Sequence, residues 1–309
     1  MRPLVLFSFV VGVSCAKPQA PEPLKCNGHE ELCGRRVDEV AFAGTHNSYA
    51  NTDEGFAAPG QTHSVKRQLR DGIRVLHFEV LSWDDVTNDA GAEISLCHGL
   101  CELGHRELAS QLRDVAAFLQ ANPGEIVVFL LERADRTVTA DDLGNAFVDA
   151  GLRVHVQPQG APWPTLGELL DGGTPVIALL DDVSGSSSPW LLPRWEWTYE
   201  TPWNNQTPAD FARCDADRGT AGNSLYVVDT YLEDEIIPTA EHARLVNYDP
   251  FLIDRVWTCR ESQQRIPNFV MVNFYEVGDV FHAVDVLNGF AAPPPSLEGF
   301  PPANFPDGG

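Results

Sequence analysis

Four ionisable side chains stand where apolar, strand-like runs of the sequence end. His46 follows the first run, Glu79 ends the second, His98 follows the third and Glu132 ends the fourth. Two histidines can serve as general base and general acid, because imidazole exchanges its proton near neutral pH. Carboxylates beside them offer oxygen ligands to a hard cation such as Ca²⁺ or Mg²⁺, which would neutralise charge developing on a phosphate. The four residues therefore predict metal-assisted cleavage of a phosphodiester.

The elements that must position these residues are short runs rich in apolar residues. Eight such runs lie at residues 40–44, 73–80, 94–97, 126–131, 153–156, 175–181, 225–229 and 268–274. Runs that are apolar throughout are typical of parallel strands buried on both faces. Apolar residues at helical spacing predict helices at residues 107–121, 140–150, 165–170 and 239–246.

This alternation of strands and helices predicts an α/β protein with a single (β/α)8 barrel of the TIM type, distorted and with disulfide-braced loops. In that fold the catalytic residues lie at the carboxyl ends of the strands. A doubly wound sheet explains the strand pattern alone nearly as well. Residues 184–208 lack periodicity and contain four tryptophans, so they form a lid or interface-binding loop, or else pack against the barrel rim.

Several ordered motifs resemble the X domain of the phosphatidylinositol-specific phospholipase C family, the PLC-like phosphodiesterases of secreted bacterial, fungal and plant type. They are THNSY at 45–49, GIRVLHFE at 72–79, HG at 98–99, NPGEIV at 122–127 leading to Glu132, and the closing strand at 265–275. The resemblance implies that His46 deprotonates the inositol 2-hydroxyl and that His98 protonates the departing diacylglycerol oxygen, giving a cyclic phosphate. It also implies a Ca²⁺ site, with Mg²⁺ as the alternative, on Asn47, Glu79 and Glu132.

Two positions depart from the family pattern. His77 stands where well-known members carry an acidic residue, and neutral imidazole is a poor Ca²⁺ ligand although it suits several other divalent metals. Asn273 stands where secreted relatives often carry Asp, so Asp229, at the end of the preceding strand, is a candidate for the orienting carboxylate.

The two carboxylates also have a purely structural interpretation. Glu79 and Glu132 could be buried partners of Arg74 or Arg133 rather than metal ligands. Beyond the catalytic histidines and the metal ligands, His77, Arg74 and Asp229 are additional candidates for the site. The competing functions are a glycerophosphodiester phosphodiesterase or sphingomyelinase D-like enzyme on the same barrel, and a non-catalytic lipid-binding lipoprotein.

The amino-acid composition restricts the kinds of molecule that the protein can bind. Lys and Arg number 21 against 44 Asp and Glu, which gives a formal net charge of −23. Nucleic-acid binding is excluded, because phosphate contacts need clustered Lys and Arg. Purely electrostatic docking to an anionic membrane is disfavoured for the same reason. We expect a phospholipid or inositol phosphodiester substrate and a membrane surface, reached peripherally or through a lipid anchor.

The amino-terminal residues resemble an export signal. Arg2 precedes an apolar run that is too short to span a bilayer, and Cys15 follows small residues and precedes a Pro-rich stretch. This resembles a bacterial lipoprotein signal with lipidation at Cys15, and plain secretion is the alternative. We predict a signal peptide at 1–14, a tether at 15–36, the barrel at 37–290 and a Pro/Gly-rich tail at 291–309.

Six further cysteines fit an exported protein. An even number in such a chain indicates disulfides. Proximity along the chain favours Cys26–Cys33 and Cys97–Cys101, which leaves Cys214–Cys259 by elimination. A zinc site is the competing interpretation, but the chain has no CxxC pair.

Overall fold

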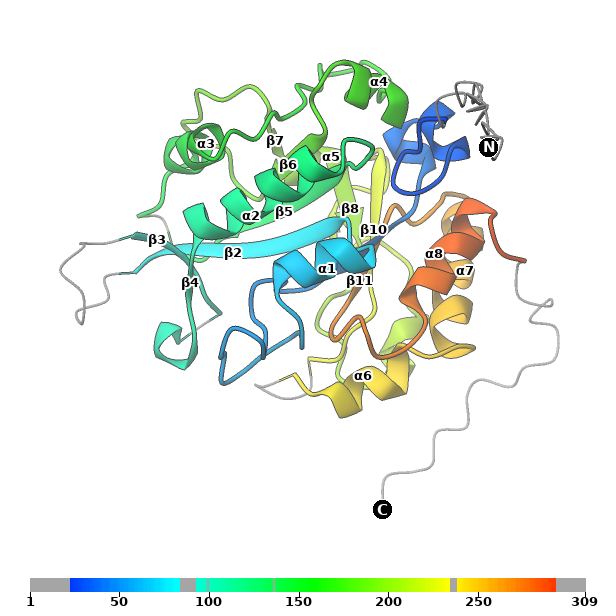
Figure 1. The fold of residues 1–309 in the computed structure, drawn as a ribbon. Coiled ribbons are helices and arrows are strands. Elements are labelled where there is room, and N and C mark those ends of the chain that lie inside the picture. The colour runs from blue at the N-terminus through cyan, green and yellow to red at the C-terminus, as the bar shows by residue number, and fades with distance from the viewer. Residues whose placement is uncertain (1–22, 84–92, 99, 136, 234–237, 293–309) are drawn as a thin grey trace, which may run out of the picture.

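The computed structural model describes residues 23–83, 93–98, 100–135, 137–233 and 238–292. In this part of the chain, eight parallel strands form a distorted barrel (Figure 1). In order around the barrel they are β1 (Phe42–Thr45), β2 (Val75–Trp83), β5 (Val127–Arg133), β6 (Val176–Leu180), β7 (Leu191–Pro193), β8 (Thr198–Glu200), β10 (Leu225–Asp229) and β11 (Phe269–Val272), which pairs with β1. Within the described residues β7 and β8 do not pair, so the barrel is open along this seam. The predicted distorted barrel is confirmed.

Helices cover the outside of the strands (Figure 1). The helices are α1 (Val65–Asp71), α2 (Leu108–Ala121), α3 (Ala140–Asp149), α4 (Leu166–Asp171), α5 (Arg194–Trp197), α6 (Ala240–Val246), α7 (Phe251–Gln263) and α8 (Val280–Asn288). Short 3₁₀ helices are η1 (Glu31–Gly34), η2 (Val37–Glu39), η3 (Cys101–Leu103) and η4 (Pro208–Ala212). The four predicted helices correspond to α2, α3, α4 and α6. The sequence did not predict α7, because it buries Arg255 and Cys259 among its apolar residues and so breaks the apolar pattern.

Two hydrophobic layers explain why the strands are apolar throughout. Val128 and Leu130 of β5 belong to the inner layer, which fills the barrel. Val127, Phe129 and Leu131 alternate with them and belong to the outer layer, between the strands and the helices. Because both faces are buried, each strand loses the alternation of polar and apolar residues that one exposed face would produce.

Two of the eight predicted strands lie outside the parallel ring, which corrects the expected strand set. Residues 94–97 fall in β3 (Glu93–Leu96), which pairs antiparallel with the extended end of β2 and with β4 (Arg106–Glu107). Val154 makes only an isolated bridge to Val176. Their places are taken by β7 and β8 in the tryptophan-rich segment, which also contains buried Trp197. Three-residue strands are too short to show periodicity. A further short strand, β9 (Arg218–Gly219), pairs antiparallel with β8.

Three disulfides brace the loops, and their pairing is as predicted: Cys26–Cys33, Cys97–Cys101 and Cys214–Cys259. The first lies in the segment before β1, where Leu166 of α4 donates its N–H to the carbonyl of Arg35. Part of the predicted tether thus packs against the barrel. Residues 1–22, which include Cys15, and residues 293–309 of the predicted tail lie outside the described residues. No described helix has the length and apolar character needed to cross a membrane.

Candidate functional site

A cavity of about 170 Å³ lies at the carboxyl ends of the parallel strands. Its lining includes most of the predicted site residues, namely His46, Asn47, His77, Glu79, His98, Glu132 and Asp229. Arg74 is not among them, so the structure does not place this candidate residue at the site. It lies at the amino end of β2, where its Nε donates to Glu125 Oε2 at 2.7 Å. A residue that begins a parallel strand lies at the opposite end of the barrel from one that ends it.

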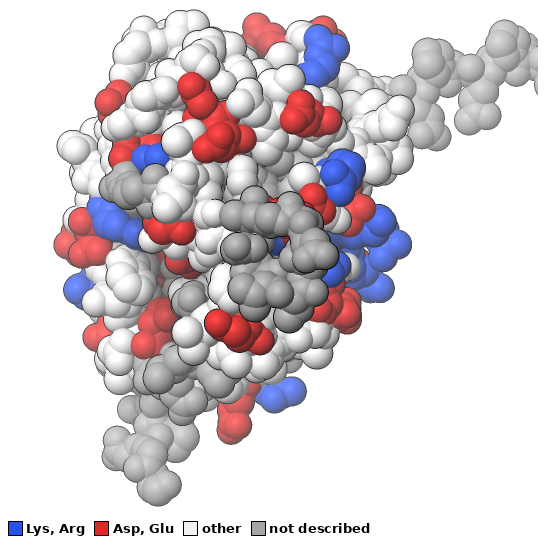
Figure 2. Space-filling view, turned by 90° about the vertical axis from the view of Figure 1, so that its left-hand side faces the viewer, with Lys and Arg blue, Asp and Glu red and all other residues white. Residues whose placement is uncertain are grey.

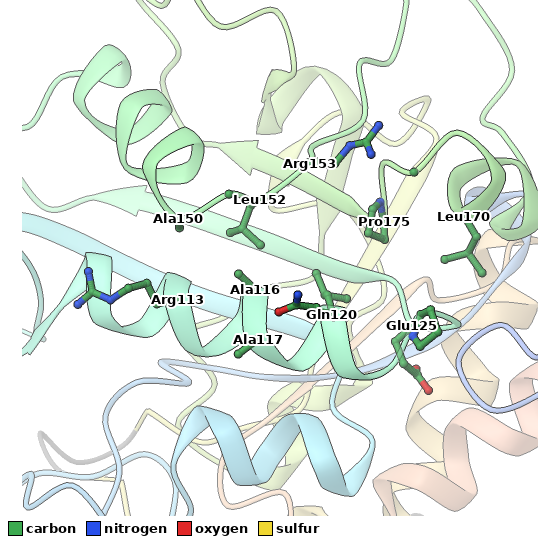
Figure 3. Close-up of a pocket in the computed structure, with 14 residues that line it drawn as sticks. Arg113, Ala116, Ala117, Gln120, Glu125, Ala150, Leu152, Arg153, Leu170 and Pro175 are labelled. Carbon is green, nitrogen blue, oxygen red and sulfur yellow. The ribbon is translucent and has the colours of Figure 1, made fainter.

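The outer surface offers two further observations. A larger cavity of about 670 Å³ lies between α2 and residues 150–153, with Arg113, Gln120 and Glu125 along it (Figure 3). It contains none of the predicted site residues. On the face toward which β2 runs, the described acidic and basic side chains are interspersed, and several basic side chains gather at its right-hand edge in this view (Figure 2).

His46 is held in one orientation at the end of β1. Its backbone N–H continues the ladder to Val272 at 3.0 Å, and its ring stacks on Tyr231 with 4.1 Å between centroids. The next residue, Asn47, turns the chain with a φ of 44°, which Asn tolerates better than most residues. His46 Nδ1 lies 3.2 Å from Asn273 Oδ1. An amide oxygen only accepts, so Nδ1 carries the proton and Nε2 is left as an acceptor.

Burial holds the pKa of His46 well below its usual value, and the nearby His77 and His98 lower it further. The ring is therefore neutral at physiological pH. A neutral imidazole with Nε2 unprotonated is the form that a general base requires.

His98 has the opposite environment. It follows β3 in the loop bounded by the Cys97–Cys101 disulfide, and about half of its side chain is exposed. Its Nδ1 lies 2.7 Å from Glu79 Oε2, and this hydrogen bond raises its pKa above the ordinary value. Asn47 Nδ2 lies 3.3 Å from the same nitrogen. A protonated imidazole held by a carboxylate is suited to donate a proton as a general acid.

His77 supports the turn that carries His46. The backbone N–H of Asn47 donates to His77 Nδ1 at 3.3 Å, which leaves Nε2 as the ring nitrogen that can donate. That nitrogen lies 3.6 Å from Glu132 Oε2. The side chain is nearly fully buried and lies 5.2 Å from His46 between ring centroids. His77 thus links the turn after β1 to the end of β5.

A cluster of four charges, of which Arg194 and Glu200 are buried, forms the other side of the cavity. We call Glu132, Arg194, Glu200 and Arg218 the seam cluster. Arg194 donates to Glu132 Oε1 and to Glu200 Oε2, each at 2.7 Å. Arg218 donates to Glu132 Oε1 at 3.3 Å and also binds Glu200. Burial works to raise the pKa of Glu132, but His77 and the two arginines hold it well below the ordinary value.

Sequence reasoning missed three of the four cluster residues. Glu132 was predicted as a site residue. The alternative interpretation, in which it pairs with an arginine, is correct about the type of partner. The partners differ from those considered, because Arg74 binds Glu125 and Arg133 pairs with Asp182 at 2.8 Å. The signal that could have found the cluster is position, because Arg194 directly follows β7 and Glu200 ends β8.

The oxygen donors expected for Ca²⁺ do not fit that ion in this arrangement. Ca²⁺ takes about six to eight oxygen ligands at close range. Glu79 Oε2 is bound to His98, while Glu132 Oε1 is bound to two guanidinium groups and its Oε2 faces His77. Unit charges about 4 Å apart near a protein surface interact by roughly 4 kcal/mol, so both arginines disfavour a second cation here. Among the described residues, no three His, Cys, Asp or Glu side chains are grouped to hold a metal ion.

Asp229 lies in the cavity but not beside His46. Its Oδ2 is buried without a hydrogen-bond partner, and burial together with the charge of Glu200 raises its pKa well above the ordinary value. The carboxylate within ion-pair distance of His46 Nδ1 is Glu233, at 3.7 Å. The orienting contact to His46 therefore comes from Asn273 and Glu233.

Comparison with known proteins identifies the family. A family model described as PI-PLC X 1 matches residues 32–288. A PI-PLC X domain-containing protein of the fungus Arthroderma benhamiae is 31% identical over 297 residues, covering 89% of this chain and 92% of the relative. A second protein of that fungus, named only as an uncharacterized secreted protein, is 28% identical. The alignment covers 85% of this chain and 63% of that relative.

Solved structures show the same fold at low sequence identity. The phosphatidylinositol-specific phospholipase C of Listeria monocytogenes matches with a TM-score of 0.57 and 14% identity, covering 84% of this chain and 95% of that protein. A variant of the corresponding Staphylococcus aureus enzyme matches with a TM-score of 0.54 and 17% identity, covering 83% of this chain and 93% of that protein. By the match over residues 32–288 and the 31% identical relative, the chain belongs to the PI-PLC X domain family.

Proposed function

We propose that this protein is a phosphodiesterase of the phosphatidylinositol-specific phospholipase C type. The observation that carries the proposal is the pair of histidines in one cavity with opposite pKa shifts, lowered for His46 and raised for His98. Acid–base catalysis at one pH needs one group unprotonated and the other protonated. Membership of the PI-PLC X domain family supports the reaction type.

The proposed reaction is an internal displacement at phosphorus. His46 Nε2 takes the proton of the inositol 2-hydroxyl, and that oxygen forms a bond to phosphorus. The bond from phosphorus to the glycerol oxygen breaks, and His98 gives its proton to the leaving oxygen. The products are diacylglycerol and a cyclic inositol phosphate. Asn273 and Glu79 act as positioning residues through their contacts with His46 and His98.

The cavity wall suits a polar headgroup. Asp229 contributes a carboxyl group to the lining, and Tyr231 and Trp203 contribute aromatic rings. A sugar-like ring offers hydroxyl groups to the first and C–H faces to the others. A cavity of about 170 Å³ holds a headgroup and leaves the acyl chains outside.

We further propose that the enzyme acts outside the cytoplasm at a membrane surface. One relative is named secreted, and three disulfides are typical of exported proteins. Leu100 and Leu103 are exposed next to the His98 loop, and Trp203 is exposed at the cavity. Apolar side chains at the rim can enter a lipid surface without a basic patch. Export with a lipid at Cys15 is part of this proposal.

The test is phosphorus NMR of the purified protein with phosphatidylinositol micelles. We expect a cyclic inositol phosphate with the wild-type protein and none with His46→Ala. Cleavage without any cyclic product would instead indicate attack by water, as expected of a glycerophosphodiester phosphodiesterase. An unchanged substrate spectrum with folded protein would indicate a lipid-binding role.

A further inference from the structure

We propose that the seam cluster takes the place of a divalent cation, so that this site works without metal and Arg218 binds the phosphodiester. The inference rests on the proposed function for its substrate, and it concerns how the site supplies positive charge. It departs from the Ca²⁺ site expected from the sequence. The observation behind it is that Arg194 and Arg218 both contact the Glu132 carboxylate.

The backbone sets up two adjacent carboxylates, as a metal site would need. Glu79 and Glu132 are direct partners in the register of β2 and β5. Their side chains, however, diverge to different cations. Glu79 binds His98 at 2.7 Å, and Glu132 binds Arg194 at 2.7 Å and Arg218 at 3.3 Å. The two carboxylates therefore hold organic cations in place of a shared ion.

The arginines are built into the fold rather than resting on its surface. Arg194 is 3% exposed and is held from its other side by Glu200, which is fully buried in β8. Both guanidinium groups also stack on Trp195, at 4.6 and 4.9 Å from the ring centroid. The cluster joins β5 to β8 and β9 across the seam where β7 and β8 do not pair. A metal ion at Glu132 could not displace the arginines without breaking this connection.

Charge accounting leads to the same conclusion. The seam cluster contains two arginines and two glutamates, so its charges cancel. An anionic phosphodiester next to it meets a guanidinium that is only partly neutralised by shared carboxylates, and such charge-assisted hydrogen bonds are strong. A divalent cation bound by Glu132 would instead compete with two guanidinium groups for the same carboxylate oxygen.

Arg218 is the member that can reach substrate. It lines the cavity and a third of its side chain is exposed, whereas Arg194 is buried. Its guanidinium also lies 5.5 Å from the ring centroid of Trp203, another residue of the cavity. Arg218 is thus assigned to phosphate binding, and Arg194 and Glu200 are positioning residues that fix its orientation.

The experiment measures product formation and binding in parallel, each with chelator and with added Ca²⁺. Product formation uses phosphatidylinositol micelles, and binding uses myo-inositol 1-phosphate in calorimetry. The variants are Arg218→Gln and Arg218→Lys, with Arg213→Gln as the control, since Arg213 is an exposed arginine nearby in the chain. Thermal unfolding of each variant verifies that it is folded.

We expect wild-type protein to form product and to bind inositol 1-phosphate equally well in chelator and in Ca²⁺. Arg218→Gln should bind the probe roughly 10- to 100-fold more weakly, as for loss of a charged hydrogen bond. Arg218→Lys should fall between the two, and Arg213→Gln should match wild type. If Arg218→Gln does not fold, the lysine variant and the wild-type comparison decide.

Two outcomes would overturn the inference while the proposed function stands: product that requires Ca²⁺, or Arg218→Gln that binds the probe like wild type. Absence of probe binding in chelator would overturn it as well. Absence of product under both conditions, with metal-free binding that depends on Arg218, would count against the proposed reaction and support the arginine site.

Discussion

The two sides of the cavity are built in opposite ways. On one side, at the ends of β1 and β3, His46 is oriented by Asn273 and Glu233, and His98 is oriented by Glu79. On the other, the four charges of the seam cluster are packed together with Glu200 fully buried. The first side holds two histidines whose pKa values are shifted in opposite directions, and the second holds carboxylates and guanidinium groups paired with one another. The difference teaches that the groups proposed for proton transfer and the paired charges lie in separate parts of this barrel.

The largest expected effect is on the proton-transfer side. His46→Ala and His98→Ala should each lower the rate of cyclic product formation by roughly 10²- to 10⁴-fold, the usual contribution of a general acid or base. The measurement is phosphorus NMR of the product with phosphatidylinositol micelles. His155→Ala is the control, because His155 bonds Gln157 away from the cavity. Near-normal rates in either variant would show that the two histidines are not the acid and the base.

The next effect is on the seam side and concerns stability. Glu200→Gln leaves Arg194 and Arg218 without their buried carboxylate, and breaking a buried pair costs about 3–5 kcal/mol of unfolding free energy. Lys66→Gln is the comparison, because the Lys66–Asp114 pair is exposed and such pairs contribute about 0–1 kcal/mol. Denaturant unfolding measures both. Equal, small losses would mean that the seam cluster does not hold the barrel together.

A pH profile would distinguish the two histidines. Glu79 raises the pKa of His98, so His98 stays protonated to higher pH than a free imidazole. Glu79→Gln removes that carboxylate, lowers this pKa and should move the basic limb of the kcat/KM profile to lower pH. The acidic limb, which reports protonation of His46, should stay in place. A shift of the acidic limb instead would exchange the assigned roles.

The smallest expected effect comes from placing a carboxylate beside His46, as the seam cluster places carboxylates beside its arginines. Asn273→Asp places a carboxylate 3.2 Å from His46 Nδ1 where an amide oxygen now lies. A carboxylate favours the imidazolium, so the pKa of His46 should rise and the acidic limb should move to higher pH. Asn205→Asp, at a buried asparagine that bonds the carbonyl of Pro202, serves as the matched control. An unmoved acidic limb would mean that Asn273 does not orient the base.

Parts of the fold were predictable and parts were not, for identifiable reasons. The long apolar strands β2, β5 and β6 were predicted because burial on both faces leaves an unbroken apolar run. The three-residue strands β7 and β8 were not, and residues 94–97 were assigned to the ring although β3 pairs antiparallel in a hairpin. Strand direction and partner depend on contacts that a local pattern does not contain.

The same division applies to the site. By itself the sequence determined which residues gather from the first half of the barrel, namely His46, Asn47, Glu79, His98 and Glu132. His46, Asn47, Glu79 and Glu132 do so because a residue at the end of a parallel strand must face the carboxyl end of the barrel. His98 reaches Glu79 by another route, through the antiparallel pairing of β3 with β2. Only the tertiary structure decided what Glu132 binds. Arg194 and Arg218 lie 62 and 86 residues beyond it in the chain, and both reach it only because the curved sheet brings β8 and β9 across the open seam from β5. Ion pairs over such separations have no periodicity in sequence, whereas strand ends do.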